Sequence, residues 1–247
     1  MDDPATPHGK GELPATRWSL VCAARGPDTT PARQALEELC RIYWHPLYCF
    51  VRRRGYSPAD AEDLVQGFFV ELLGSDFFEK ANPEKGRMRG FLLSTLRFFL
   101  SDERKHADAF KRGGGIEFVP LDLTGAEDRY LCQPSSGESP EQCYDRRWAL
   151  LFVQRVIHLL ADRWKTNGKA DLFTALNPFL FSEMEGAETH RLAAKFAMTE
   201  GNVRQNLHRL RGEFRAVFRE EVADTVASVS DVEEEIAALR AALLEAV

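Results

Sequence analysis

Apolar side chains recur every three to four residues along most of this chain, which is the period of an α-helix with one buried face. The clearest example follows Ser57-Pro58 and has the apolar residues Leu64, Val65, Phe68, Phe69, Leu72 and Leu73. Alternation of the kind that favours a β-strand is limited to a short stretch near residue 116, which reads IEFVPLDL. The pattern therefore predicts an all-α fold.

Local start and stop signals divide this pattern into separate helices. A capping residue followed by proline marks three starts, at Thr30-Pro31, Ser57-Pro58 and Ser139-Pro140. Glycine marks two ends, at Gly55 and Gly168. We expect helices over about 30–54, 58–73, 88–110, 140–167, 171–181 with a break at Asn177-Pro178, 189–196, 200–222 and 231–245.

Composition changes along the chain predict how it is divided. The net charge of −6 is concentrated in two places, because residues 113–145 and residues 221–247 each carry one Lys or Arg against seven Asp or Glu. Residues 113–139 also contain three consecutive glycines and the segment PSSGESP. We expect two small helical domains, at 16–112 and 140–222, joined by a flexible acidic linker at 113–139 and followed by an acidic C-terminal helix at 223–247.

Two segments of this acidic chain are locally basic. Residues 85–112 carry eight Lys or Arg against three Asp or Glu, and residues 204–219 carry five against one. Surface fields are screened within about 10 Å in ordinary salt, so each segment could meet phosphate on its own. The alternative for either segment alone is a solvated helix face.

Other classes of protein are not favoured. No apolar run approaches the roughly 20 residues of a membrane span, and the polar N-terminal segment does not resemble a secretory signal. The five cysteines contain no CxxC pair, so we expect reduced thiols in a cytoplasmic protein rather than a disulfide framework or a zinc site. No cofactor and no metal are expected.

Residues 189–218 read THRLAAKFAMTEGNVRQNLHRLRGEFRAVF and predict a helix-turn-helix. Two amphipathic helices would flank a turn at Ala197-Met198-Thr199, and Thr199 can cap the second helix. The second helix of such a motif enters the major groove by its N-terminal residues. Its outward side chains are of types that bind base edges or phosphates: Asn202, Arg204, Gln205, His208, Arg209 and Arg211. The alternative is an αα-hairpin with solvated cations.

The helix expected over 88–110 interleaves aromatic and basic residues, including Arg97, Phe98, Arg104 and Lys105. Aromatic side chains flanked by cations suit an unpaired nucleic-acid strand, because bases can stack while the backbone is neutralised. The alternative is that the phenylalanines belong to the core. That alternative is favoured for Phe99, which continues the apolar stripe, and stays open for Phe98.

Three segments together resemble a known family. SPADAEDLVQGFFVELL, GRMRGFLLSTLRFFLSDERKHADAFKR and the helix-turn-helix occur in the order typical of bacterial RNA polymerase sigma factors of the extracytoplasmic-function group, in a divergent, longer branch. The resemblance implies a protein that is not an enzyme. It would bind core RNA polymerase, recognise promoter DNA and initiate transcription through a region 2-like and a region 4-like domain.

The resemblance also assigns residues to three surfaces. Core polymerase would be bound by Asp60, Asp63, Gln66, Val70 and Glu71. The unpaired minus-ten element would be bound by Phe91, Arg97, Phe98, Asp102, Arg104 and Lys105. The minus-thirty-five duplex would be bound by Asn202, Arg204, Gln205, His208 and Arg209. Two positions depart from the family: Phe98 replaces a residue that is often Asn, which favours stacking, and Gly67 replaces a common acidic residue.

Several alternatives stay open at this stage. One is a helix-turn-helix regulator that binds DNA without polymerase. A less favoured one is a metal-dependent hydrolase that uses Asp60, Asp63 and Glu71. Control by an anti-sigma factor, by a regulatory kinase acting near residues 134–140, or by an acidic last helix that shields the region 4-like domain is also open.

Overall fold

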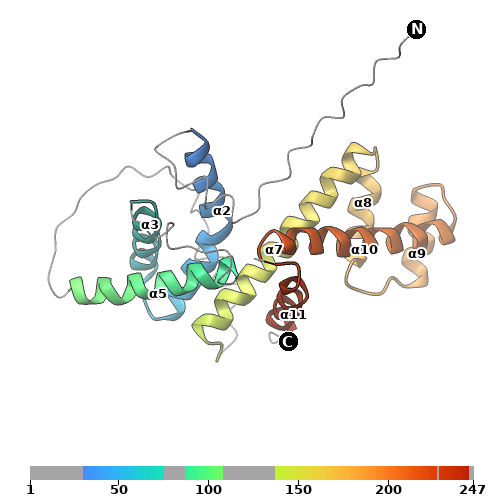
Figure 1. Ribbon diagram of the computed structural model, residues 1–247. Coiled ribbons are helices and arrows are strands. Elements are labelled where there is room, and N and C mark those ends of the chain that lie inside the picture. Colours follow the sequence, from blue (N-terminus) through green and yellow to red (C-terminus); the bar gives the residue numbers. More distant parts are fainter. Residues whose placement is uncertain (1–29, 75–86, 108–136, 227, 245–247) are drawn as a thin grey trace, which may run out of the picture.

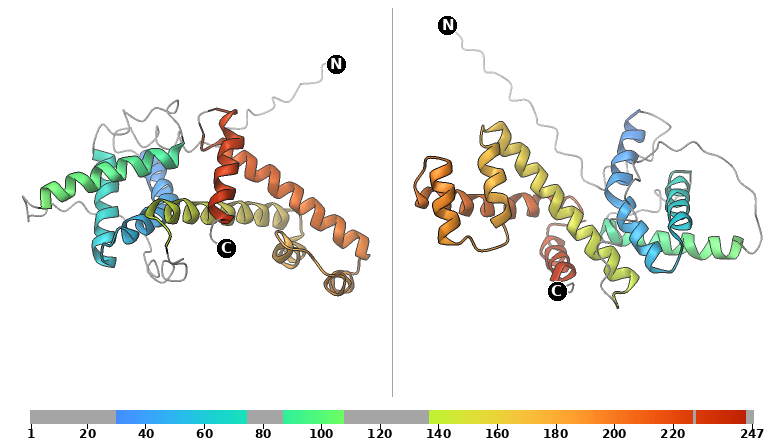
Figure 2. Two further views of the ribbon diagram at one scale, coloured as in Figure 1. Left: turned by 90° about the horizontal axis from the view of Figure 1, so that it is seen from below. Right: turned by 180° about the vertical axis from the view of Figure 1, so that it is seen from behind.

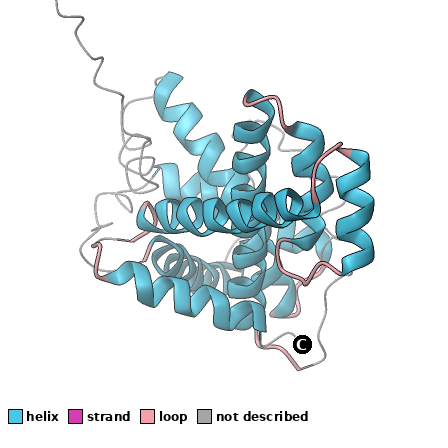
Figure 3. Cartoon of the chain, turned by 90° about the vertical axis from the view of Figure 1, so that its right-hand side faces the viewer, coloured by secondary structure: helices cyan, strands magenta, loops and turns pink. Residues whose placement is uncertain are grey.

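A computed structural model describes residues 30–74, 87–107, 137–226 and 228–244 of the chain. These residues form eight α-helices and one 3-10 helix and contain no strand. The helices are α2 (Thr30–Arg53), α3 (Pro58–Gly74), α5 (Met88–Ala107), α7 (Pro140–Thr166), α8 (Ala170–Leu176), η2 (Asn177–Phe179), α9 (Gly186–Lys195), α10 (Glu200–Ala223) and α11 (Asp231–Leu244). The all-α prediction is thus confirmed for the described residues. Figure 3 shows these helices and the loops between them.

Local capping chemistry explains several helix ends. The Ser139 hydroxyl accepts a hydrogen bond from the Gln142 amide, and the Gln142 side chain accepts one from the Ser139 amide, so a complete capping box starts α7. At the other end of α7, Gly168 has a φ of 68°. Its amide donates to the Lys165 carbonyl over 3.0 Å, which closes the helix in the left-handed conformation that glycine favours. These are the ends that the sequence predicts.

Helix α7 connects the two ends of the molecule. Helices α2, α3 and α5 lie on one side and α8, α9 and α10 on the other, and α7 runs obliquely from one group to the other (Figures 1 and 2). Helix α11 packs against α7 and α10. The most extensive contact between two elements of the described chain joins α2 to α7, across the domain boundary expected from composition.

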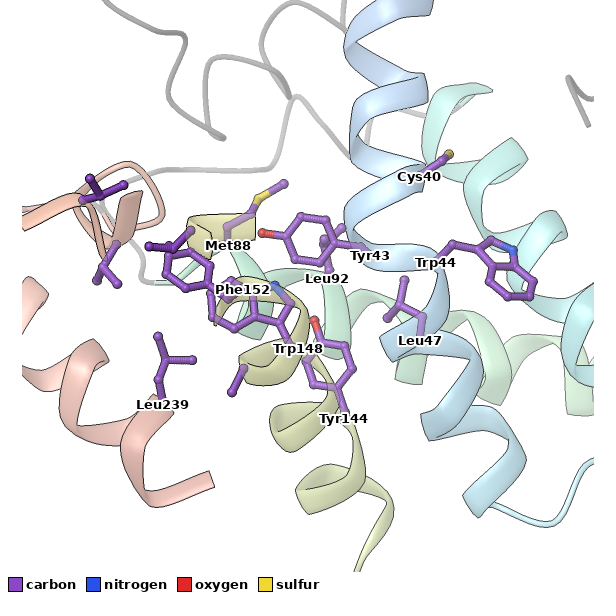
Figure 4. Packing of buried hydrophobic residues seen from close by; sticks show 14 of the residues in the cluster. Cys40, Tyr43, Trp44, Leu47, Met88, Leu92, Tyr144, Trp148, Phe152 and Leu239 are labelled. Carbon is purple, nitrogen blue, oxygen red and sulfur yellow. The ribbon is translucent and has the colours of Figure 1, made fainter. Parts of the chain in front are cut away.

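Large aromatic side chains make this α2–α7 contact. Tyr43 of α2 and Trp148 of α7 stack with their ring centres 6.4 Å apart, and both are fully buried (Figure 4). Trp148 stacks in turn on Phe152, whose ring meets the edge of Phe218 of α10 at 5.1 Å. The buried residues of both groups of helices thus form one continuous core. The division into two domains stays a prediction, and residues 113–136 of the expected linker lie outside the described residues.

A buried ionic cluster joins α5, α7 and α11. The Arg89 Nε donates to the Glu235 carboxylate over 2.6 Å, and Arg87 Nε lies 2.9 Å from the same carboxylate. Arg89 also pairs with Asp145 of α7. The Tyr144 hydroxyl donates to the Arg89 carbonyl over 3.0 Å. Because a buried charge without partners is costly, these contacts fix α11 on the other two helices.

Candidate functional site

The turn between α9 and α10 is held by a Schellman motif. The Met198 amide donates to the Ala193 carbonyl over 3.0 Å, and the Ala197 amide donates to the Ala194 carbonyl over 3.4 Å. Ala197 has a φ of 50°, a left-handed conformation that glycine adopts more easily. The Thr199 hydroxyl then accepts from the Asn202 amide over 3.2 Å and caps α10, as predicted. Two helices are thereby fixed in a helix-turn-helix arrangement.

The predicted duplex-binding residues lie on the outer side of α10. Val203, Leu207 and Leu210 are buried against the rest of the fold. The five predicted residues are all exposed: Asn202, Arg204, Gln205, His208 and Arg209. The structure therefore brings them together on the side of α10 that a groove could reach.

Contacts within the molecule hold the Arg209 side chain of α10 in place. The Arg209 guanidinium lies 4.9 Å from the centre of the Trp164 ring, and its Nε lies 3.3 Å from Glu213. Trp164 donates to the same carboxylate over 2.6 Å. These residues, with Asn167 and Lys169, line an open cavity of about 420 Å³. Arg209 therefore sits at the edge of α10 that faces α7.

Arg211 has a different role from its exposed neighbours. Its Nη2 donates to the carbonyls of Phe179 and Ser182, over 2.9 and 2.6 Å. These bonds fix the segment between α8 and α9. The sequence pattern places Arg211 among the outward cations of α10, and the structure shows a half-buried side chain that orders a neighbouring loop.

On α5, the structure separates two adjacent phenylalanines. Phe99 is 7% exposed and meets the edge of Phe68 at 5.8 Å, which confirms its expected place in the core. Phe98 is 68% exposed. Phe91 is half-buried, and Asp102 is exposed. Arg104 and Lys105 fall within α5, but their side chains lie outside the described residues.

Arg97 of α5 is engaged with α7. Its Nη2 lies 2.5 Å from the Glu141 carboxylate, and its guanidinium carbon lies 5.9 Å from the Phe50 ring centre. The hydrogen bond from Arg97 helps to lower the pKa of Glu141, against the opposing effect of burial, which is the largest single influence on that carboxyl. A predicted minus-ten residue is thus paired with the first turn of α7.

The predicted polymerase-binding residues share the outer side of α3. Ala61, Val65 and Phe68 are buried on its inner side. Asp63, Gln66 and Val70 follow each other at helical spacing and are at least partly exposed, as are Asp60 and Glu71. Asp60 also stabilises the first turn of α3, because its carboxylate accepts a hydrogen bond from the Ser57 hydroxyl over 2.6 Å. Gly67 allows close approach to α5, since a Cβ there would lie 3.4 Å from the Phe99 ring.

Glu71 of α3 lies near Asp102 and Glu103 of α5, and these three residues form an acidic cluster. Partial burial raises the pKa of Glu71, and the nearby carboxylates of Glu103 and Asp102 raise it further. The family resemblance assigns Glu71 to polymerase and Asp102 to the minus-ten element, whereas the structure brings both into one electrostatic cluster. Glu103 was missed, because nothing in the linear sequence links it to α3.

The chain has no match among protein-family models, among curated proteins or among solved structures. None of the described helices has the length and apolar character needed to cross a membrane. Among the residues that the structure describes, no three His, Cys, Asp or Glu side chains form a group suited to a metal ion.

Proposed function

We propose that this protein is a sigma factor that binds core RNA polymerase, recognises promoter DNA and starts its opening. Residues on three helices support the proposal. The acidic outer side of α3 would bind polymerase, α5 would bind the unpaired minus-ten strand, and α10 would bind the minus-thirty-five duplex. The residues are those that the family resemblance assigns.

The observation that carries the proposal is the exposed ring of Phe98. Burying a phenylalanine contributes about 1.5–3 kcal/mol, so a ring left in water lacks a stabilising contact. Stacking one base on an aromatic side chain is worth about 1–3 kcal/mol. Since Phe98 is adjacent to Arg97 on α5 and α10 presents a different surface, unpaired and paired DNA would be bound at two places.

The main alternative is a helix-turn-helix regulator that binds DNA through α9 and α10 without polymerase. The same exposed face of α10 supports it. It gives no role, however, to Phe98 or to the acidic cluster of Glu71, Asp102 and Glu103. For this reason we favour the sigma-factor proposal.

Run-off transcription tests the proposed function. The full chain is mixed with core RNA polymerase and a library of genomic fragments, and transcripts are sequenced at their 5′ ends. We expect transcripts that start at a fixed distance from a shared upstream motif and that are absent without the chain. DNA binding without such transcripts would favour the helix-turn-helix regulator.

A further inference from the structure

Two cysteines from distant parts of the sequence meet between α2 and α7. Cys49 and Cys143 are 2% and 6% exposed. The Cys49 sulfur lies 3.4 Å from His45 Nδ1, which accepts a hydrogen bond from Arg147, one helical turn after Cys143 on α7, and each thiol influences the pKa of the other. Both are free thiols in this structure. A disulfide between them would bring the two Sγ atoms to about 2.0 Å.

Basic side chains surround the pair. Arg146 forms a two-point ion pair with Glu138, at 2.6 and 2.7 Å, and Arg53 donates to the Glu138 carbonyl over 3.1 Å. Arg147 Nε donates to His45 Nδ1 over 2.7 Å. The same Nδ1 lies 3.4 Å from the Cys49 sulfur. Because Arg147 only donates, His45 Nδ1 is the acceptor of this hydrogen bond.

The two thiols are not equivalent. The hydrogen bond from Cys49 is the largest influence on the pKa of Cys143 and lowers it, as do the guanidinium groups of Arg146 and Arg53, whereas burial and the Glu138 carboxylate act in the opposite direction. The contact with Cys143, together with burial, raises the pKa of Cys49. Cys143 is also the less buried of the two thiols, so it is the better nucleophile of the pair.

We propose that Cys49 and Cys143 form an oxidisable dithiol whose oxidant is a hydroperoxide. The Cys143 thiolate attacks one peroxide oxygen, the O–O bond breaks, and a sulfenic acid forms as the leaving oxygen takes up a proton to give water or an alcohol. Cys49 then attacks the sulfenic sulfur, loses its proton, and displaces hydroxide, which leaves as water. Two thiols are oxidised to one disulfide and one peroxide is reduced.

The disulfide would fix α7 on α2. Cys143 is two residues after Glu141, so the bond would also hold Glu141 near Arg97 of α5. Under the proposed function, an oxidised chain would keep a minus-ten residue engaged with α7 and would open promoters less readily. This consequence rests on the proposed function, whereas the chemistry of the dithiol does not.

Peptide mapping of the full chain tests the dithiol directly. The chain is treated with hydrogen peroxide, blocked with an alkylating reagent, digested without reductant and analysed by mass spectrometry. We expect a linked peptide pair that contains Cys49 and Cys143. Cys40→Ser is the matched control, because Cys40 is also a buried α2 cysteine, and it should leave the link unchanged. Cys143→Ser should abolish it.

A sulfenic-acid trap tests the order of the two steps. With Cys49→Ser, the resolving thiol is absent, and dimedone should label Cys143. With Cys143→Ser, labelling of Cys49 should be about tenfold lower. Thermal unfolding of each variant checks that it is folded. A disulfide formed by another pair, overoxidation without a disulfide, or preferential labelling of Cys49 would overturn the proposal, whether or not the chain binds polymerase.

Discussion

Arg89 of α5 donates a hydrogen bond of 2.6 Å to Glu235 of α11, although the two residues are 146 positions apart in the sequence. Glu235 is fully buried, and Arg87 lies 2.9 Å from its carboxylate. Together these ion pairs fix the acidic C-terminal helix on the first group of helices. Helix α11 also contacts α7 and α10. Its proposed shielding role stays a prediction.

Glu235→Ala should be strongly destabilising. It would leave Arg89 buried without its main partner, which typically costs about 3–5 kcal/mol. Urea unfolding followed by circular dichroism measures the change. Glu234→Ala is the matched control, because Glu234 is exposed and lies 3.5 Å from Arg87, and its effect should stay below about 0.5 kcal/mol. Equal effects of the two variants would contradict the role of Glu235.

Ala197→Gly should stabilise the protein by about 0.5–1 kcal/mol, because glycine adopts the left-handed conformation of this turn with less strain. Gly168→Ala is the mirror experiment at the end of α7, where the same motif holds a glycine. It should destabilise by a similar amount. Thermal unfolding of both variants checks the pair, and a shift of both melting temperatures in one direction would contradict this interpretation.

Glu71→Gln should raise the melting temperature at neutral pH by about 1 °C at low salt. The folded-state pKa of Glu71 lies above its ordinary value of 4.5, so the unfolded chain gives up this proton more easily. Stability from Glu71 is therefore present at low pH and is lost as the pH rises through 4.5 and the folded-state pKa. The increase in melting temperature caused by Glu71→Gln should vanish below about pH 4 and become smaller in high salt. A lower melting temperature for Glu71→Gln at pH 7 would contradict the unfavourable placement of Glu71 in the acidic cluster.

Phe98→Ala should impair promoter opening while leaving the fold intact. The exposed ring makes little contribution to stability, whereas Phe99→Ala should cost about 3–5 kcal/mol because Phe99 is in the core. Permanganate reactivity of the melted strand measures opening. Normal opening with Phe98→Ala would argue against stacking.

Arg209→Ala is the functional contrast, because it should weaken binding of duplex DNA. It should also reduce the slope of log affinity against log salt concentration by about one.

The helix ends could be predicted from the sequence because their causes are local. Ser139 caps α7 and Thr199 caps α10 through amides three residues away, and Gly168 ends α7 through its own φ. The inward and outward sides of α3 and α10 follow from the same helical period. The predicted site residues of α3 and α10 accordingly lie on the outer sides of these two helices.

Contacts between distant segments could not be predicted in this way. Nothing in the spacing of Arg89 and Glu235, or of Cys49 and Cys143, indicates that they meet. The helical period places Phe99 in the core but leaves its neighbour Phe98 open, and only the structure shows that the Phe98 ring is exposed. Arg211 fits the outward pattern of cations, yet the carbonyls of Phe179 and Ser182 hold it against the fold.

The most direct measurement of the central claim is the association of the purified full chain with core RNA polymerase. The two are mixed at about 0.15 M salt and separated by gel filtration, with Asp63→Lys as a variant at the exposed side of α3. We predict that the chain elutes with the polymerase and that this substitution weakens the complex at least about tenfold. Elution of the unmodified chain apart from the polymerase would contradict the account, whatever its affinity for DNA.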